Sequence, residues 1–113
     1  VLVKQRKWDE AAAAHRRSAE IRRQLMKANP DVAEFQRKLA SSFMNLGVVH
    51  RERGELEAAR DQFLEARSLR RKIRDVEPKD INTRRDLAMG CYNLANLYLA
   101  LEHDLTIMPV ISE

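Results

Sequence analysis

The stretch LGVVHRERGELEAARDQFLEA, residues Leu46–Ala66, carries the clearest structural signal in the chain. Gly54 stands near its middle, where a glycine can take the left-handed conformation that ends a helix. Beyond Gly54, apolar side chains recur at helical spacing. These apolar positions are Leu56, Ala59, Phe63, Ala66, Leu69 and Ile73. The pattern predicts two helices, over residues 32–53 and 55–76, joined at Gly54.

The same helix pair belongs to an internal repeat. When the chain is compared with itself at an offset of 48 residues, the two halves match without a gap from Val1 to about Leu101. A fixed period of this kind is the signature of repeat proteins. The identical pairs include Ala11 with Ala59, Arg22-Arg23 with Arg70-Arg71, Pro30 with Pro78, Arg37 with Arg85, Leu39-Ala40 with Leu87-Ala88, and Asn45-Leu46 with Asn93-Leu94.

Proline divides each unit into two helices. Asn29-Pro30 and Glu77-Pro78 should each end the preceding helix, because proline lacks the backbone N–H and restricts its predecessor. Asp31, followed by Glu34, resembles a capping box that would open the next helix. We therefore expect four helices of about 30 Å each, over residues 9–28, 32–53, 55–76 and 80–101.

The apolar pattern predicts how these helices pack. Leu39, Phe43, Leu46 and His50 share one face of the second helix, and small residues beside them should permit close approach of a neighbour. The helix over residues 80–101 is apolar almost all round, so we expect it to be buried on several sides.

Composition excludes several classes of protein. The chain has 113 residues, of which 34% are charged and 44% hydrophobic, with three Gly, three Pro and a formal net charge of +4. This balance favours an all-α protein. Cys91 is the only cysteine, so no internal disulfide forms. No run reaches the roughly 20 apolar residues that span a bilayer, and we expect a cytoplasmic protein.

The motif at residues 46–66 resembles the tetratricopeptide repeat. The matching positions are Leu46-Gly47, His50 in the place of the usual Tyr, Gly54, Ala59, Phe63, Ala66 and then Pro78. The period of 48 departs from the usual 34 or so. It is similar to that of long-period bacterial arrays attached to serine/threonine kinases, whose repeats carry phrases like EFQRKLASS at residues 34–42.

This resemblance implies a fold and a division of the chain. The fold would be an all-α solenoid of antiparallel helix pairs stacked into a superhelix. Residues 1–7 would be the tail of a preceding helix, residues 8–101 the repeats, and residues 102–113 a C-terminal tail. The terminal helices would leave apolar faces exposed, and we expect the tail or a second copy to cover them, the latter as a homodimer.

The resemblance also implies a function. The first helix of each unit would line a concave groove that binds a peptide or protein partner, so the chain would be a non-enzymatic scaffold without cofactor or metal, part of a larger signalling protein. The expected groove residues are Ser41, Met44, Asn45, Val48, Arg51 and Glu52, followed by Met89, Tyr92, Asn93 and Asn96. Met44 and Tyr92 stand where some relatives have a Lys that clamps a peptide carboxylate, so we do not expect a ligand of that kind.

Two other functions remain open. The recurring arginine pairs could form a basic ridge for nucleic acid, although acidic residues lie between them and no aromatic stacking platform accompanies them. Self-association through the terminal helices is the second. An enzyme is not expected, because His15, His50 and His103 have no partners that would complete a triad or a metal site.

Overall fold

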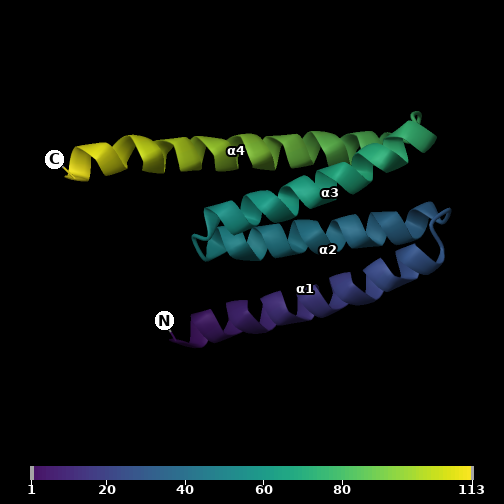
Figure 1. Cartoon of the computed structure of the whole chain (residues 1–113), viewed down its shortest axis with the longest axis horizontal. Helices are drawn as coiled ribbons and strands as arrows, with labels where there is room; N and C mark the ends of the chain where they lie inside the picture. The colour runs from purple at the N-terminus through teal and green to yellow at the C-terminus, as the bar shows by residue number, and fades with distance from the viewer. Residues whose placement is uncertain (1, 113) are drawn as a thin grey trace.

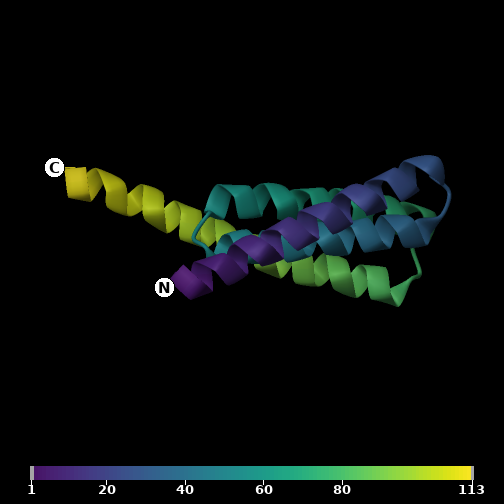
Figure 2. The same ribbon diagram turned by 90° about the horizontal axis from the view of Figure 1, so that it is seen from below.

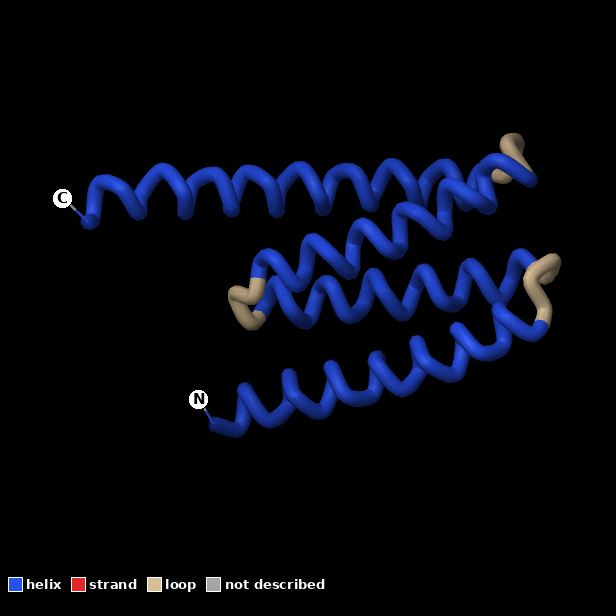
Figure 3. Tube along the Cα trace, in the orientation of Figure 1, coloured by secondary structure: helices blue, strands red, loops and turns tan. Residues whose placement is uncertain are grey.

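The chain folds as four antiparallel helices laid side by side (Figure 1). The computed structural model describes the backbone of residues 2–112 and the side chains of residues 4–102. The helices are α1 (Leu2–Ala28), α2 (Ala33–Glu52), α3 (Leu56–Val76) and α4 (Ile81–Ser112). Short turns join them at alternating ends of the molecule (Figure 3), and the described residues contain no strand. The predicted all-α solenoid of helix pairs is confirmed.

The two proline corners are equivalent. At the first, the Val32 N–H donates to the Asn29 carbonyl at 3.1 Å, and at the second the Asp80 N–H donates to the Glu77 carbonyl at 3.1 Å. Both turns connect antiparallel helices at the same end of the molecule (Figure 3). The 48-residue repeat in sequence is therefore a repeat in structure.

The capping prediction for the second helix is wrong. The N-cap of α2 is Val32, with extended backbone and no side-chain hydrogen bond, so Asp31 lies one residue too early to cap. The cap is built at the equivalent position of the other corner. Asp80 accepts hydrogen bonds from the Asn82 N–H at 3.1 Å and the Thr83 hydroxyl at 2.9 Å. These bonds, the Thr83 one foremost, and the nearby Arg37 guanidinium lower the pKa of Asp80.

Gly54 ends α2 as predicted. Its φ is +78°, in the left-handed region. The Gly54 N–H donates to the Arg51 carbonyl at 2.9 Å, and the Glu55 N–H donates to the His50 carbonyl at 2.8 Å. This pair of bonds is the Schellman motif, which satisfies the last carbonyls of a helix.

The core lies along α2 and α3 in two clusters. The first joins α1, α2 and α3 through Ala19, Leu39, Ala40, Phe43, Leu46, Ala66 and Leu69. The second joins α3 and α4 through Ala59, Phe63, Leu94 and Leu97. The predicted face of Leu39, Phe43, Leu46 and His50 is buried throughout. Gly47 is the small residue that lets α3 approach α2, because its α-carbon lies against the Phe63 ring.

The expected burial of α4 on several sides is wrong. Ile81, Met89, Tyr92 and Leu99 are 59–75% exposed. The helix packs mainly against α3, which it crosses at an angle (Figure 2). An apolar pattern on all sides of a helix is compatible with burial on several sides, but burial also requires neighbouring helices, and α4 has mainly α3.

The two outer helices are longer than expected. Residues 2–7 form the first turns of α1 itself, because no Gly or Pro interrupts the helix before Asn29. Residues 102–112 continue α4 and project beyond the α2–α3 turn instead of folding back over it (Figure 1). Val1 and Glu113 lie outside the described residues. Among the helices described, none is both long and apolar enough to cross a bilayer.

Candidate partner-binding face

The expected groove residues lie on α2 and α4, the two first helices of the repeat units. The structure brings these helices together at Met44, whose methyl group lies near Gly90 on α4. The Asn93 amide also reaches Met44, with 3.8 Å between Asn93 Nδ2 and Met44 Sδ. We call the part of these two helices that carries the expected groove residues the α2–α4 face.

Three of the six expected residues on α2 serve packing. Met44 and Val48 are half-buried and lie against the cluster that joins α3 and α4. The Arg51 guanidinium lies over the Phe63 ring, 6.0 Å from its centroid. The other three, Ser41, Asn45 and Glu52, are exposed.

The expected groove residues on α4 are more exposed to solvent than those on α2. Tyr92 is 68% exposed and Met89 is 59% exposed, and Asn96 is also exposed. Tyr92 therefore does not serve packing, although its equivalent Met44 does. The difference follows from position, because α2 has a helix on both sides whereas α4 packs mainly against α3.

These side chains can bind a peptide by complementary contacts. The Tyr92 ring and the Met89 thioether offer apolar surface, and the amides of Asn45 and Asn96 can each donate and accept hydrogen bonds. Asn93 is half-buried and bridges the two helices, so it positions this surface.

Leu99 extends the face and was not among the expected residues. It is 63% exposed and follows Tyr92 by seven residues, which places both on one side of α4. The 48-residue repeat could have identified it, because its equivalent Arg51 was among the expected groove residues.

The arginine pairs are partly used inside the molecule. Arg22 Nη1 donates to the Lys38 carbonyl at 2.9 Å and to Ser42 Oγ at 2.7 Å. Arg70 is half-buried, and burial lowers its pKa. The Arg23 guanidinium packs over the Phe43 ring at 5.5 Å. These arginines of the expected basic ridge therefore hold neighbouring helices together.

The histidine of the motif is also structural. His50 is 7% exposed, and its Nδ1 lies 3.0 Å from Glu55 Oε1 at the α2–α3 turn. The hydrogen bond from His50 lowers the pKa of Glu55. His50 thus fills the aromatic packing position and ties α2 to the start of α3.

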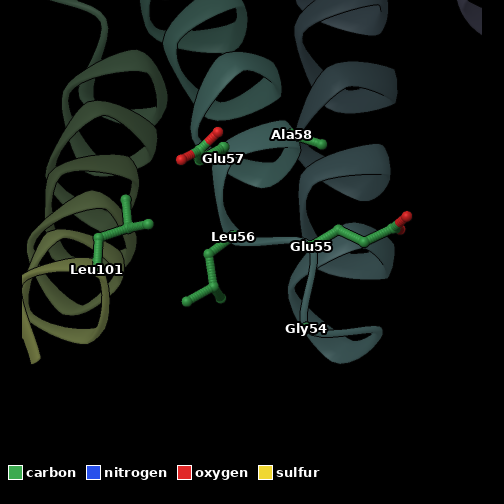
Figure 4. Close-up of a pocket in the computed structure, with 6 residues that line it drawn as sticks. All are labelled: Gly54, Glu55, Leu56, Glu57, Ala58 and Leu101. Atoms are coloured by element: carbon green, nitrogen blue, oxygen red, sulfur yellow. The ribbon is translucent and has the colours of Figure 1, made fainter. Parts of the chain in front are cut away.

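Beside that turn, an open depression lies between the start of α3 and Leu101 of α4 (Figure 4). Leu56 and Leu101 border it, and both also pack against the cluster that joins α3 and α4. Within the described residues, no group of three or more His, Cys, Asp or Glu side chains is arranged to hold a metal ion.

Comparison with protein families matches residues 39–75 to the tetratricopeptide repeat. The match begins in α2 and ends in α3, so it covers the helix pair that Gly54 joins. No curated protein and no solved structure matched the chain. A tetratricopeptide repeat is generally a module for protein–protein interaction, and this segment is similar to one.

Proposed function

We propose that the chain is a non-enzymatic scaffold that binds a peptide or protein partner on the α2–α4 face. The observation that carries the proposal is the exposure of Tyr92 and Met89 beside the amides of Asn45 and Asn96. Large apolar side chains on an otherwise polar surface are typical of interaction sites. The helices beneath them are packed on a common core, so the surface is preformed.

The partner would lie along both helices. On α2 it would contact Ser41, Asn45 and Glu52, and on α4 it would contact Met89, Tyr92 and Asn96. An extended peptide fits this surface, because its backbone groups can pair with the asparagine amides while one apolar side chain packs on Tyr92. We further propose that the scaffold belongs to the long-period bacterial type and forms part of a larger signalling protein.

The experiment begins with peptides selected from a display library against the whole chain. Binding of each selected peptide is then compared between the native chain and the variants Tyr92→Ala and Asn96→Ala. We expect each substitution to weaken binding by about tenfold or more, since the loss of a central aromatic contact commonly costs more than 1 kcal/mol.

Val76→Ala is the matched control. Val76 is 79% exposed at the end of α3, away from the α2–α4 face, and its loss should leave binding unchanged. The proposal fails if no peptide is selected, or if all three variants bind as the native chain does.

A further inference from the structure

The outer side of α1 exposes an apolar stripe that α3 buries. We define the α1 stripe as Ala11, Ser18, Ile21 and Leu25. Ala11 and Ser18 are half-buried, and Ser18 Oγ lies 3.3 Å from Ser42 Oγ of α2. Ile21 is 59% exposed and Leu25 is 42% exposed. The equivalent residues on α3, 48 positions later, are Ala59, Ala66, Leu69 and Ile73, each no more than 6% exposed. Ile21 and Leu25 match Leu69 and Ile73 closely in size, so the second half of α1 presents to solvent the kind of surface that α3 packs into the core.

The outer side of α4 exposes a second stripe, whose equivalent residues on α2 are buried. We define the α4 stripe as Ala88, Cys91, Ala95 and Tyr98, all exposed. The equivalent residues on α2 are Ala40, Phe43, Gly47 and His50, all buried. Tyr98, for example, is 45% exposed where His50 is 7% exposed.

The buried counterparts of the two stripes meet within the chain. Ala40 and Phe43 of α2 share a core cluster with Ala66 and Leu69 of α3. Gly47 lies against Phe63 of α3. The α2–α3 interface is thus made of surfaces whose equivalents lie open at the two outer sides of the molecule.

We propose that copies of this chain associate head to tail, with the α4 stripe of one copy docked on the α1 stripe of the next. The contact would reproduce the α2–α3 interface between molecules. It uses surfaces other than the α2–α4 face, so it goes beyond the partner binding proposed above and leaves that face free.

The closest contact point is compatible with this pairing. In the α2–α3 interface, Gly47 leaves no room for a methyl group beneath Phe63. In the intermolecular contact, Ala95 supplies that methyl group, and the ring opposite it becomes the smaller imidazole of His15. The larger residue on one side is offset by a smaller residue on the other, as close packing requires.

Two ion pairs of the internal interface are missing from the copy-to-copy contact. Within the chain, Arg37 of α2 pairs with Glu77 at 2.7 Å and with Asp80 at 2.8 Å across the second corner. Its equivalent, Arg85, would face the first corner of the next copy, where Asn29 replaces Glu77 and Val32 replaces Asp80. We therefore expect a reversible association that grows with protein concentration.

Because the two stripes differ, the contact is heterologous. A pair of copies therefore still has one unoccupied α1 stripe and one unoccupied α4 stripe. Each copy retains one free stripe, so the native chain should form a distribution of short linear oligomers. A symmetric pairing of two α4 stripes would instead stop at a dimer.

Sedimentation velocity over a series of concentrations tests the proposal with two variants. Ile21→Glu places a charge in the α1 stripe, and Ala95→Glu places one in the α4 stripe. Each variant alone should be monomeric, with association weakened at least about tenfold. An equimolar mixture should form heterodimers and nothing larger, because one intact α4 stripe can still meet one intact α1 stripe.

Val76→Glu is the control, since Val76 is exposed on α3 outside both stripes, and it should associate as the native chain does. Asn29→Glu restores one of the two missing partners of Arg85 and should strengthen association severalfold. A native chain that stays monomeric up to its solubility limit overturns the proposal. So does an Ile21→Glu variant that still dimerises, since that result identifies symmetric α4 pairing.

Discussion

Gly47 of α2 lies directly against the ring of Phe63 of α3, so closely that a β-carbon added to Gly47 would overlap the ring. Phe63 is 1% exposed and belongs to the cluster that joins α3 to α4. A methyl group on Gly47 would therefore have to displace the buried ring. This contact sets the distance between the two central helices.

Gly47→Ala should destabilise the fold. Alanine favours a helix over glycine by about 1 kcal/mol, but overpacking a filled core typically costs 1–3 kcal/mol. We expect a net loss of about 1 kcal/mol in the free energy of unfolding, measured by urea denaturation. A variant more stable than the native chain would contradict the close approach of α2 and α3.

Gly90, one residue from the α4 stripe, should respond in the opposite direction. A β-carbon there would lie 3.6 Å from Met44 Cε and 3.8 Å from Arg70 Nη1, which is ordinary van der Waals contact. Gly90→Ala should therefore gain about 1 kcal/mol from helix propensity, a rise of several degrees in Tm.

Gly90→Ser tests the repeat itself. Arg22 Nη1 bonds both the Lys38 carbonyl and Ser42 Oγ, and Arg70 Nη1 reaches the equivalent Asp86 carbonyl at 3.5 Å. The equivalent of Ser42 is Gly90, so a serine there should supply the missing acceptor. We expect Gly90→Ser to be more stable than its propensity predicts, and expect that excess to vanish when Arg70→Met is added.

The acid sensitivity of the fold should depend on Asp80. Its pKa is lowered in the folded chain, so its contribution to stability is present above the ordinary pKa of about 4 and is lost as the pH falls through the lower, folded-state value. Asp80→Asn keeps a capping side chain but cannot titrate. The difference in Tm between pH 7 and pH 3 should be smaller for the variant. An unchanged difference would show that the cap does not contribute to the acid response.

Much of the fold could be predicted because the signals were local. Pro30, Pro78 and Gly54 restrict the backbone wherever they stand, so they fixed the corners and the end of α2. The buried face of α2 followed from spacing alone. The choice of N-cap did not, because Asp31 and Val32 are neighbours and only the geometry of the turn decides which of them begins the helix.

The candidate site was harder to predict for a reason of packing. Met44 and Tyr92 occupy the same position in the repeat, yet Met44 packs against the cluster that joins α3 and α4 whereas Tyr92 is exposed. The sequence pattern of a repeat gives each unit the same surfaces, but the number of neighbours decides which of them stay open. The assignment of the ten expected groove residues to partner binding stays a prediction.

The measurement that tests the partner-binding face most directly is chemical-shift mapping by NMR. A ¹⁵N-labelled chain would be titrated with a peptide selected against it. We predict that the largest changes fall on Asn45, Tyr92, Asn93 and Asn96, including the side-chain amides of the asparagines. Changes concentrated instead on the outer surfaces of α1 and α3 would contradict the account.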